Sequence, residues 1–183
     1  MKKLLITIIA GIIIPLTVSA QDRYYTRNGH IDFFSHSPLE DIKADNEQAA
    51  VFLNITDGSI SAAMLMKSFV FEKALMQQHF NENYIESDEF PRSEFDGKIE
   101  DFSTLDFKAS AMQKVTATGK ITLHGITRDI SINGTIGKKA EKYRLDAKFN
   151  LRPSDFDIRI PSSKKDNIAE EIEVTLSAQL IAM

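Results

Sequence analysis

The sequence predicts an all-β fold, an antiparallel barrel or sandwich of about eight short strands with one short helix. Two observations predict it. Apolar and polar residues alternate along many short stretches, and a single internal stretch has helical spacing instead. Alternation gives each strand one apolar and one polar face, as in antiparallel sheets that bury only one side. Turn residues between the stretches favour strands that return on one another.

The second half of the chain carries the clearest alternation. In residues 115–123, 130–136, 143–149 and 172–180, apolar or small residues hold one parity, and charged, amide or hydroxyl residues hold the other. Each stretch is therefore expected to be a strand with one buried face. Residues 137–139 (Gly-Lys-Lys) lie between two of these strands, and we expect them to form a hairpin loop.

The first half is strand-like but less regular. Strands are expected where apolar residues recur at every second position, in residues 29–35, 51–55, 60–66, 95–99 and 105–109. Asp57-Gly58 separates two of them and is typical of a tight turn. The side chains inside a barrel of this size either fill it or leave room for one small ligand, and composition leaves both alternatives open.

One stretch breaks the alternation and predicts a helix over residues 72–84, about three turns long. Glu72 lies near the expected start, where an acidic side chain suits the helix dipole. Pro91 prevents the helix from continuing. The helix is a candidate lid for one end of the barrel, and the apolar residues expected to face inward from it are Leu75, Met76, Phe80 and Tyr84.

Residues 1–20 have the pattern of a secretory signal peptide. Lysines precede an apolar run over residues 4–16, and small residues follow at the expected cleavage position. The run is short for a membrane span of about 20 residues, which favours cleavage over a retained anchor. We expect residues 21–183 to be one domain of a periplasmic or secreted protein without a stable membrane span.

Composition excludes several function classes. The net charge is −4, and no basic cluster is present, so nucleic acid is not an expected partner. The chain has no cysteine, which excludes disulfides, thiolate metal sites and a cysteine nucleophile. It also lacks a Gly-rich phosphate loop and a serine nucleophile elbow. We therefore expect a binding protein, not an enzyme, with no catalytic residue and no cofactor.

The histidines His30, His36, His79 and His124 are the remaining candidates for site chemistry. His30 and His36 lie at even spacing on one expected strand with Asp32 between them, a pattern that can bind a metal. Exposed histidines near a loop are commonplace, so we expect no metal there. His124 has the outward parity of its strand and is expected to be solvated. His79 either presents its imidazole to a ligand head group or, the reading we prefer, hydrogen-bonds a backbone carbonyl near the helix end.

Three segments resemble the YceI-like family. Residues 119–128 (Gly-Lys-Ile-Thr-Leu-His-Gly-Ile-Thr-Arg) are similar to its strand, turn and second strand. Residues 75–80, followed by Phe90-Pro91 and Phe95, resemble its helix and the strand after it, and residues 152–158 are a weaker match. The sequence departs from the family pattern, as a divergent branch would, at Tyr24-Tyr25, residues 30–33, Asp129 and Asp157.

The resemblance implies an extended, lipocalin-like antiparallel barrel. Characterised relatives enclose long isoprenoid chains, so it also implies a long apolar ligand, either a polyprenyl lipid or a quinone with an isoprenoid tail. Phenylalanine and methionine are frequent in the first half of the chain and suit such a ligand. The residues expected to line the apolar interior are Met64, Met66, Phe69, Phe71, Met76, His79, Phe80, Tyr84 and Phe95.

Two functions stay open on the sequence alone. The first is carriage or sequestration of an isoprenoid-type lipid in the barrel, with no chemistry carried out on it. The second is a ligand-free envelope stress or protein-interaction module, which requires a filled interior and a sizeable exposed apolar patch. A homodimer is compatible with either function.

Overall fold

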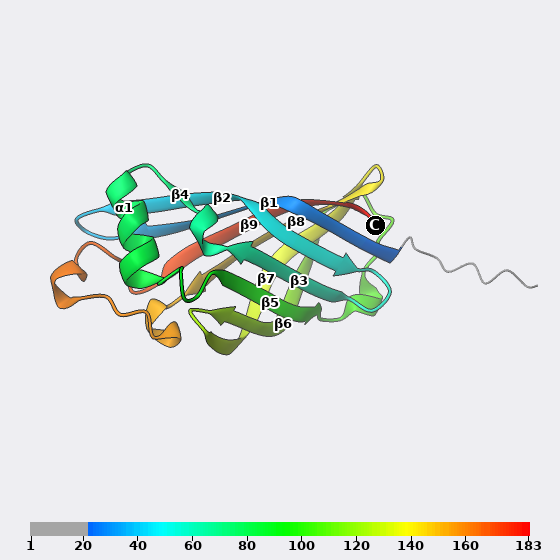
Figure 1. Ribbon diagram of the computed structural model, residues 1–183. Coiled ribbons are helices and arrows are strands. Elements are labelled where there is room, and N and C mark those ends of the chain that lie inside the picture. The colour runs from blue at the N-terminus through cyan, green and yellow to red at the C-terminus, as the bar shows by residue number, and fades with distance from the viewer. Residues whose placement is uncertain (1–21) are drawn as a thin grey trace, which may run out of the picture.

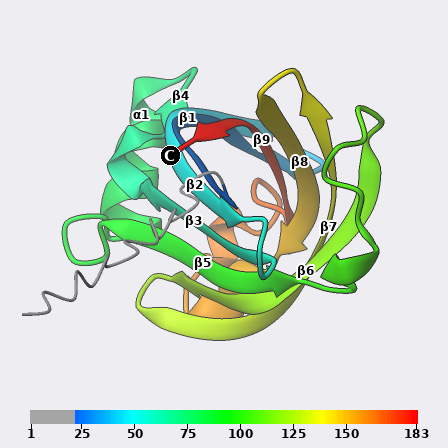
Figure 2. The same ribbon diagram turned by 90° about the vertical axis from the view of Figure 1, so that its right-hand side faces the viewer.

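The computed structural model describes residues 22–183, which form a closed antiparallel barrel of eight strands with a short helix across one end (Figure 1, Figure 2). The expected signal peptide lies outside the described residues. Among residues 22–183, no helix is long and apolar enough to cross a membrane. The barrel strands are β1 (Arg23–His36), β2 (Asp41–Asn54), β3 (Ser59–Leu65), β5 (Arg92–Ile99), β6 (Gln113–Leu123), β7 (Ile126–Lys139), β8 (Lys142–Leu151) and β9 (Ile172–Ala182).

Every barrel strand pairs antiparallel with two neighbours. The order around the barrel is β1-β9-β8-β7-β6-β5-β3-β2, and β2 pairs with β1 to close it. Closure leaves the barrel without an unpaired edge. A ninth strand, β4 (Val70–Phe71), adds to β2 at Ala44 and Asp45, and it connects the barrel to the helix.

The alternation in the sequence sorts residues to the two faces of the barrel, so the predicted fold class is confirmed. On β6, Ala117, Ile121 and Leu123 are buried, whereas Thr118 and Lys120 are exposed. The other strands divide in the same way, because successive side chains of a strand point to opposite faces of the sheet. The interior therefore holds nearly all of the buried aliphatic and aromatic side chains.

Two predicted elements are wrong. Residues 137–139 belong to β7, and the turn to β8 lies at residues 140–141. Gly137 is needed because another segment packs closely against it and not because the chain turns there. A Cβ at this position would lie 2.8 Å from the Met112 sulfur. Residues 105–109 form a loop and not a strand. Their alternation arises because Leu105 and Phe107 pack against the core while the polar residues between them face solvent.

The end of the barrel opposite the helix is packed solid, and we call it the closed end. Leu53, Ile136 and Leu180 are at most 1% exposed there. The rings of Tyr24 and Tyr143 meet edge to face, with their centroids 4.5 Å apart. The Tyr143 hydroxyl donates a hydrogen bond of 2.7 Å to the carbonyl oxygen of Phe107, which ties the 105–112 loop over this end.

Truncation of a closed-end side chain is expected to destabilise the protein strongly. The Leu53→Ala substitution removes a fully buried side chain and leaves a void, which costs about 2–5 kcal/mol. Leu39→Ala is the matched control, because Leu39 is 69% exposed and its truncation should change the free energy of unfolding by at most about 0.5 kcal/mol. Urea denaturation measures both values, and equal losses would contradict the packing described here.

Burial of Tyr143 predicts a loss of stability at high pH. Burial, with Tyr24 alongside, raises the pKa of the Tyr143 phenol from 10 to about 12. The folded state therefore keeps its proton at pH values where the unfolded state has lost it, and stability falls as the pH rises from 10 to 12. Denaturation across this range should show a steeper decline for the wild type than for Tyr143→Phe, and parallel declines would refute the assignment.

Candidate functional site

A cavity of about 230 Å³ occupies the end of the barrel under the helix, which we call the open end. Residues of the barrel strands, of the helix and of the long loop between β8 and β9 line it. The helix and this loop lie at the same end of the barrel (Figure 1). The loop contributes a row of apolar side chains, among them Pro153, Phe156, Ile158, Ile160 and Ile168. The interior is thus filled at one end and hollow at the other.

The helix over the cavity is α1 (Ala74–His79), which continues as one π-helical turn over Phe80–Tyr84. The predicted helix is confirmed, with a start two residues later than expected. Met76, Phe80 and Tyr84 line the cavity, as the helical spacing predicts. The inward placement of Leu75 is wrong, because this side chain is 61% exposed. Leu75 lies about 100° around the helix axis from Met76, so its side chain is off the face that Met76, Phe80 and Tyr84 turn toward the cavity.

An aromatic cluster holds the helix on the barrel. The Phe33 ring, on the inner face of β1, lies 5.4 Å from that of Phe69, 5.7 Å from Phe71 and 5.5 Å from Phe80. Phe80 also lies 5.0 Å from Phe71. Aromatic pairs at such separations gain about 0.5–1.5 kcal/mol beyond their buried area. The same four rings form part of the cavity wall, so the wall and the attachment of the helix are one structure.

The structure brings eight of the nine predicted interior residues together around this one cavity. These are Met64, Met66, Phe69, Phe71, Met76, His79, Phe80 and Tyr84. Phe95 is buried but does not line the cavity, and its ring covers Gly97 in the middle of the barrel instead. Sequence reasoning missed the strand residues that complete the floor and the walls, although their inward parity marks them: Ile31, Ile42, Ile121, Leu123 and Val174.

Most polar groups in the cavity wall already have partners. The Ser93 hydroxyl donates to the carbonyl oxygen of Thr122 at 3.0 Å, and the Ser35 hydroxyl accepts from the Ala169 backbone N–H at 2.9 Å. No buried side-chain nitrogen or oxygen among residues 22–183 lacks a hydrogen-bond partner. Because most polar groups in the wall already have hydrogen-bond partners, the cavity suits an apolar occupant.

Charged groups lie at the rim of the cavity. Glu40, in the turn between β1 and β2, accepts a hydrogen bond of 2.8 Å from the Lys73 ammonium, immediately before α1. The Lys73 ammonium, with Lys164 nearby, lowers the pKa of the Glu40 carboxyl, and Glu40 in turn raises the pKa of Lys73. The backbone N–H of Leu39 also donates to the carbonyl oxygen of Asp166 at 3.3 Å. These contacts join the turn, the helix and the long loop around one opening.

Two polar residues of the lid face the cavity. His79 and Tyr84 are both half-buried and line its wall. Burial raises the pKa of the Tyr84 phenol, so its hydroxyl stays protonated and can donate a hydrogen bond at neutral pH. Both side chains therefore combine an apolar body with a polar tip at the edge of an apolar space.

The expectation that His124 is solvated is wrong. His124 sits in the β6–β7 turn with a φ of +51°, so the alternation of the strand no longer decides where its side chain points. The side chain is 10% exposed, and its ring packs at 4.4 Å against Phe90. Its Nδ1–H donates to the carbonyl oxygen of Phe156 at 2.9 Å, and Nε2 lies 2.9 Å from a carboxylate oxygen of Glu86. His124 thereby fixes the segment after the lid and the start of the long loop to one turn.

Barrel, lid and apolar cavity together define a lipocalin-like barrel with a hollow end. The chain belongs to the family of YceI-like domains, whose model matches residues 25–180, so the resemblance seen in the sequence is confirmed. A comparison with curated protein sequences finds no match.

Solved structures share the fold at low sequence identity. A polyisoprenoid-binding domain from Saccharophagus degradans, implicated in plant cell wall breakdown, has a TM-score of 0.76 and 10% identity, over 89% of this chain and 99% of that one. BcnA of Burkholderia cenocepacia has a TM-score of 0.67 and 16% identity, over 83% and 95% of the two chains. The Campylobacter jejuni YceI protein has a TM-score of 0.56 and 16% identity, over 98% and 97%.

The lid should loosen when its aromatic anchor is removed. Phe80→Ala deletes the ring that contacts Phe33, Phe69 and Phe71, and we expect amide hydrogen exchange across residues 74–84 to accelerate about tenfold or more. Amides of β6 and β7 should exchange at the wild-type rate. Leu75→Ala, in the same helix but exposed, is the control and should leave the lid amides unchanged. Equal acceleration in both variants would show that the ring does not hold the helix.

Proposed function

We propose that the protein binds a long apolar isoprenoid-type lipid, a polyprenyl lipid or a quinone, and carries or sequesters it without chemistry. The observation that carries this proposal is the apolar cavity of about 230 Å³ under the lid. The Saccharophagus degradans domain, which shares the fold, is described as polyisoprenoid-binding. The pattern of residues 1–20 supports a periplasmic or secreted site of action.

The driving force for binding would be the removal of apolar surface from water. Each Å² of apolar surface buried contributes about 25 cal/mol, and an isoprenoid chain offers little else to recognise. Methionines at positions 64, 66 and 76 suit a branched, flexible ligand, because their unbranched side chains adapt to its shape. His79 and Tyr84 are placed to meet a polar head group at the edge of the cavity.

The size of the cavity limits how much of a chain it holds without rearrangement. An apolar cavity of about 150 Å³ accommodates benzene, with six carbon atoms, so about 230 Å³ accommodates roughly nine carbons, or about two isoprene units. A longer chain must displace the methionines and the lid, or extend through the rim. The closed end offers no further room, because Leu53, Ile136 and Leu180 fill it.

The wall chemistry supports binding over catalysis. The titratable side chains among the described lining residues are Glu40, His79, Tyr84 and Lys164, and all four lie at the rim or on the lid. Glu40 is already engaged with Lys73. The two serines of the wall, Ser35 and Ser93, hydrogen-bond to backbone groups, and the hydrogen bonds of the described residues pair neither hydroxyl with a histidine that could serve as a general base.

A ligand-free interaction module is the second candidate, and one observation favours it. Leu39, Val70 and Leu75, on the β1–β2 turn, β4 and α1, are each more than 60% exposed. These elements surround the open end, where an apolar surface would suit a protein partner or a second copy of the chain. That function requires a filled interior, however, and the cavity supports the carrier proposal instead.

Filling the cavity tests the proposal. The purified wild type, extracted with organic solvent and analysed by mass spectrometry, should release a lipid with isoprene repeats. Met64→Trp places a bulky ring in the cavity, and we expect it to weaken binding of a farnesyl-chain probe at least about tenfold. Met112→Trp is the control, since Met112 is 43% exposed on the 105–112 loop and should bind like the wild type.

The test also separates the two candidates. Probes of ten, fifteen and forty carbons measure how far the lid yields to a longer chain. If the wild type neither releases nor takes up any of these lipids, the carrier proposal fails. Equal binding by Met64→Trp and the wild type would place the ligand outside this cavity.

A further inference from the structure

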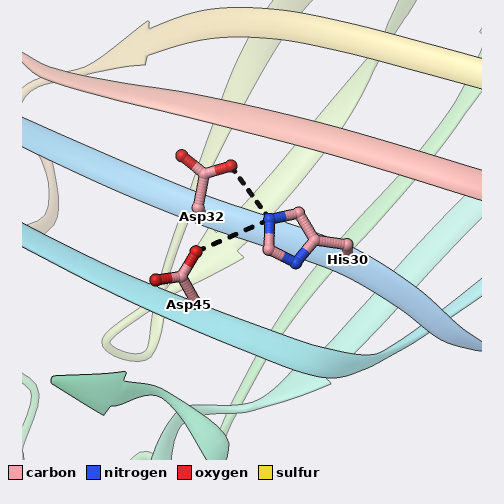
Figure 3. Close-up of side chains that lie close together, drawn as sticks. All are labelled: His30, Asp32 and Asp45. Carbon is pink, nitrogen blue, oxygen red and sulfur yellow. Dashed lines mark ion pairs between the residues drawn. The ribbon is translucent and has the colours of Figure 1, made fainter.

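A second cluster of chemically active side chains lies on the outer face of the barrel, on strands β1 and β2. His30 and Asp32 project from β1 on the face opposite Ile31, and Asp45 projects from β2, where it pairs directly with Asp32 (Figure 3). His30 Nε2 lies 3.2 Å from an Asp32 carboxylate oxygen and 3.6 Å from one of Asp45. One potential ligand atom from each of the three residues lies within 4.8 Å of the other two.

The hydrogen bond between His30 and Glu47 determines which imidazole nitrogen faces the two aspartates. His30 Nδ1 lies 2.8 Å from an oxygen of Glu47, and a carboxylate can only accept, so Nδ1 carries the hydrogen. In the neutral imidazole Nε2 then holds a lone pair, and this lone pair faces the carboxylate oxygens of Asp32 and Asp45. Acceptors that converge in this way are favourable only where positive charge lies close to them. The Lys43 ammonium, 3.0 Å from the Asp45 oxygen, already supplies one such charge, and a metal ion among the three atoms would supply another.

Two of the three separations between the ligand atoms fit a transition-metal site. Bonds of about 2.0–2.1 Å in tetrahedral coordination set neighbouring ligand atoms about 3.3 Å apart. The separations of 3.2 and 3.6 Å between Nε2 and the carboxylate oxygens bracket this value. Glu47 supplies the outer carboxylate that commonly orients a metal-bound histidine. Mg²⁺ and Ca²⁺ prefer oxygen ligands throughout, whereas imidazole with carboxylate suits Zn²⁺ and its neighbours.

We propose that His30, Asp32 and Asp45 bind one divalent transition-metal ion of the Zn²⁺ class, with solvent in the remaining position. His36, which the sequence pattern places on the same strand as His30, is not a ligand of this site, because its imidazole pairs instead with Asp41 at 2.6 Å. The third protein ligand comes from the neighbouring strand, a pairing that the spacing within β1 does not reveal. Lys43 competes for the site, since its ammonium lies 3.0 Å from the Asp45 oxygen and must move aside.

The position of the site means that a bound ion would stabilise the folded barrel. Strands β1 and β2 form a hairpin in the barrel wall, so an ion bound by both strands cross-links that hairpin. Binding to the folded state alone stabilises it by mass action. The same strands carry Phe33 and Ile42 into the cavity, on the opposite face of the sheet.

Zinc titration of the purified full chain tests the proposal by isothermal calorimetry and by thermal melting. The wild type should take up one Zn²⁺, and a hundredfold excess over Kd should raise Tm by about 5 °C or more. His30→Ala and Asp45→Asn should each weaken binding at least about tenfold and reduce the rise in Tm at the same zinc concentration to about half or less. Lys43→Met should bind more tightly, because it removes the competing ammonium.

His36→Ala is the matched control, because it removes an exposed histidine of the same strand that already has a carboxylate partner. It should bind zinc like the wild type. Far-UV circular dichroism confirms that each variant is folded. Binding that is absent in the wild type, or lost equally in His36→Ala, would overturn the proposal.

Discussion

Closure of eight alternating strands fixes the volume inside the barrel, and the rest of the structure depends on how side chains share that volume. A barrel of eight strands is just wide enough to be filled by side chains or to hold one ligand. This chain is filled at one end of the barrel and hollow at the other. Leu53, Ile136 and Leu180 fill the closed end, and the aromatic and methionine side chains at the open end leave a cavity of about 230 Å³ between them.

The lid depends on the same volume. A helix as short as α1 with its π-helical turn is not stable alone in water, so its position rests on tertiary contacts. Those contacts are the Phe80 cluster and the ladder between β4 and β2. Because the cluster is also cavity wall, the same rings that hold the lid border the space that the proposed ligand would fill. A chain longer than the cavity accommodates would therefore have to replace contacts between the lid and the barrel with its own.

The sequence predicted the architecture well because alternation is a direct consequence of a sheet with one buried face. It also marked the lid, since helical spacing within alternating strands is conspicuous, and most of the cavity-lining residues follow from those two patterns. It failed where a residue leaves regular structure. His124 and the 105–109 loop both follow the parity of a strand, but one sits in a turn and the other crosses the end of the barrel.

Contacts between segments distant in the chain were also beyond prediction. The long loop of residues 152–171 shows no periodicity, yet Phe156 and Ile158 are buried in the cavity wall. Its place depends on hydrogen bonds from His124 and to Asp166, which no local pattern encodes. In the same way, Asp45 joins His30 and Asp32 only through the register of two strands.

Strand β1 shows how one segment can serve two sites without conflict. Ile31 and Phe33 point into the cavity, and His30 and Asp32 point outward, because a period of two sends neighbours to opposite faces. A substitution on one face therefore leaves the chemistry of the other intact. The two faces nevertheless share one backbone, and the inner face of β1 carries the Phe33 ring on which Phe80 of the lid packs.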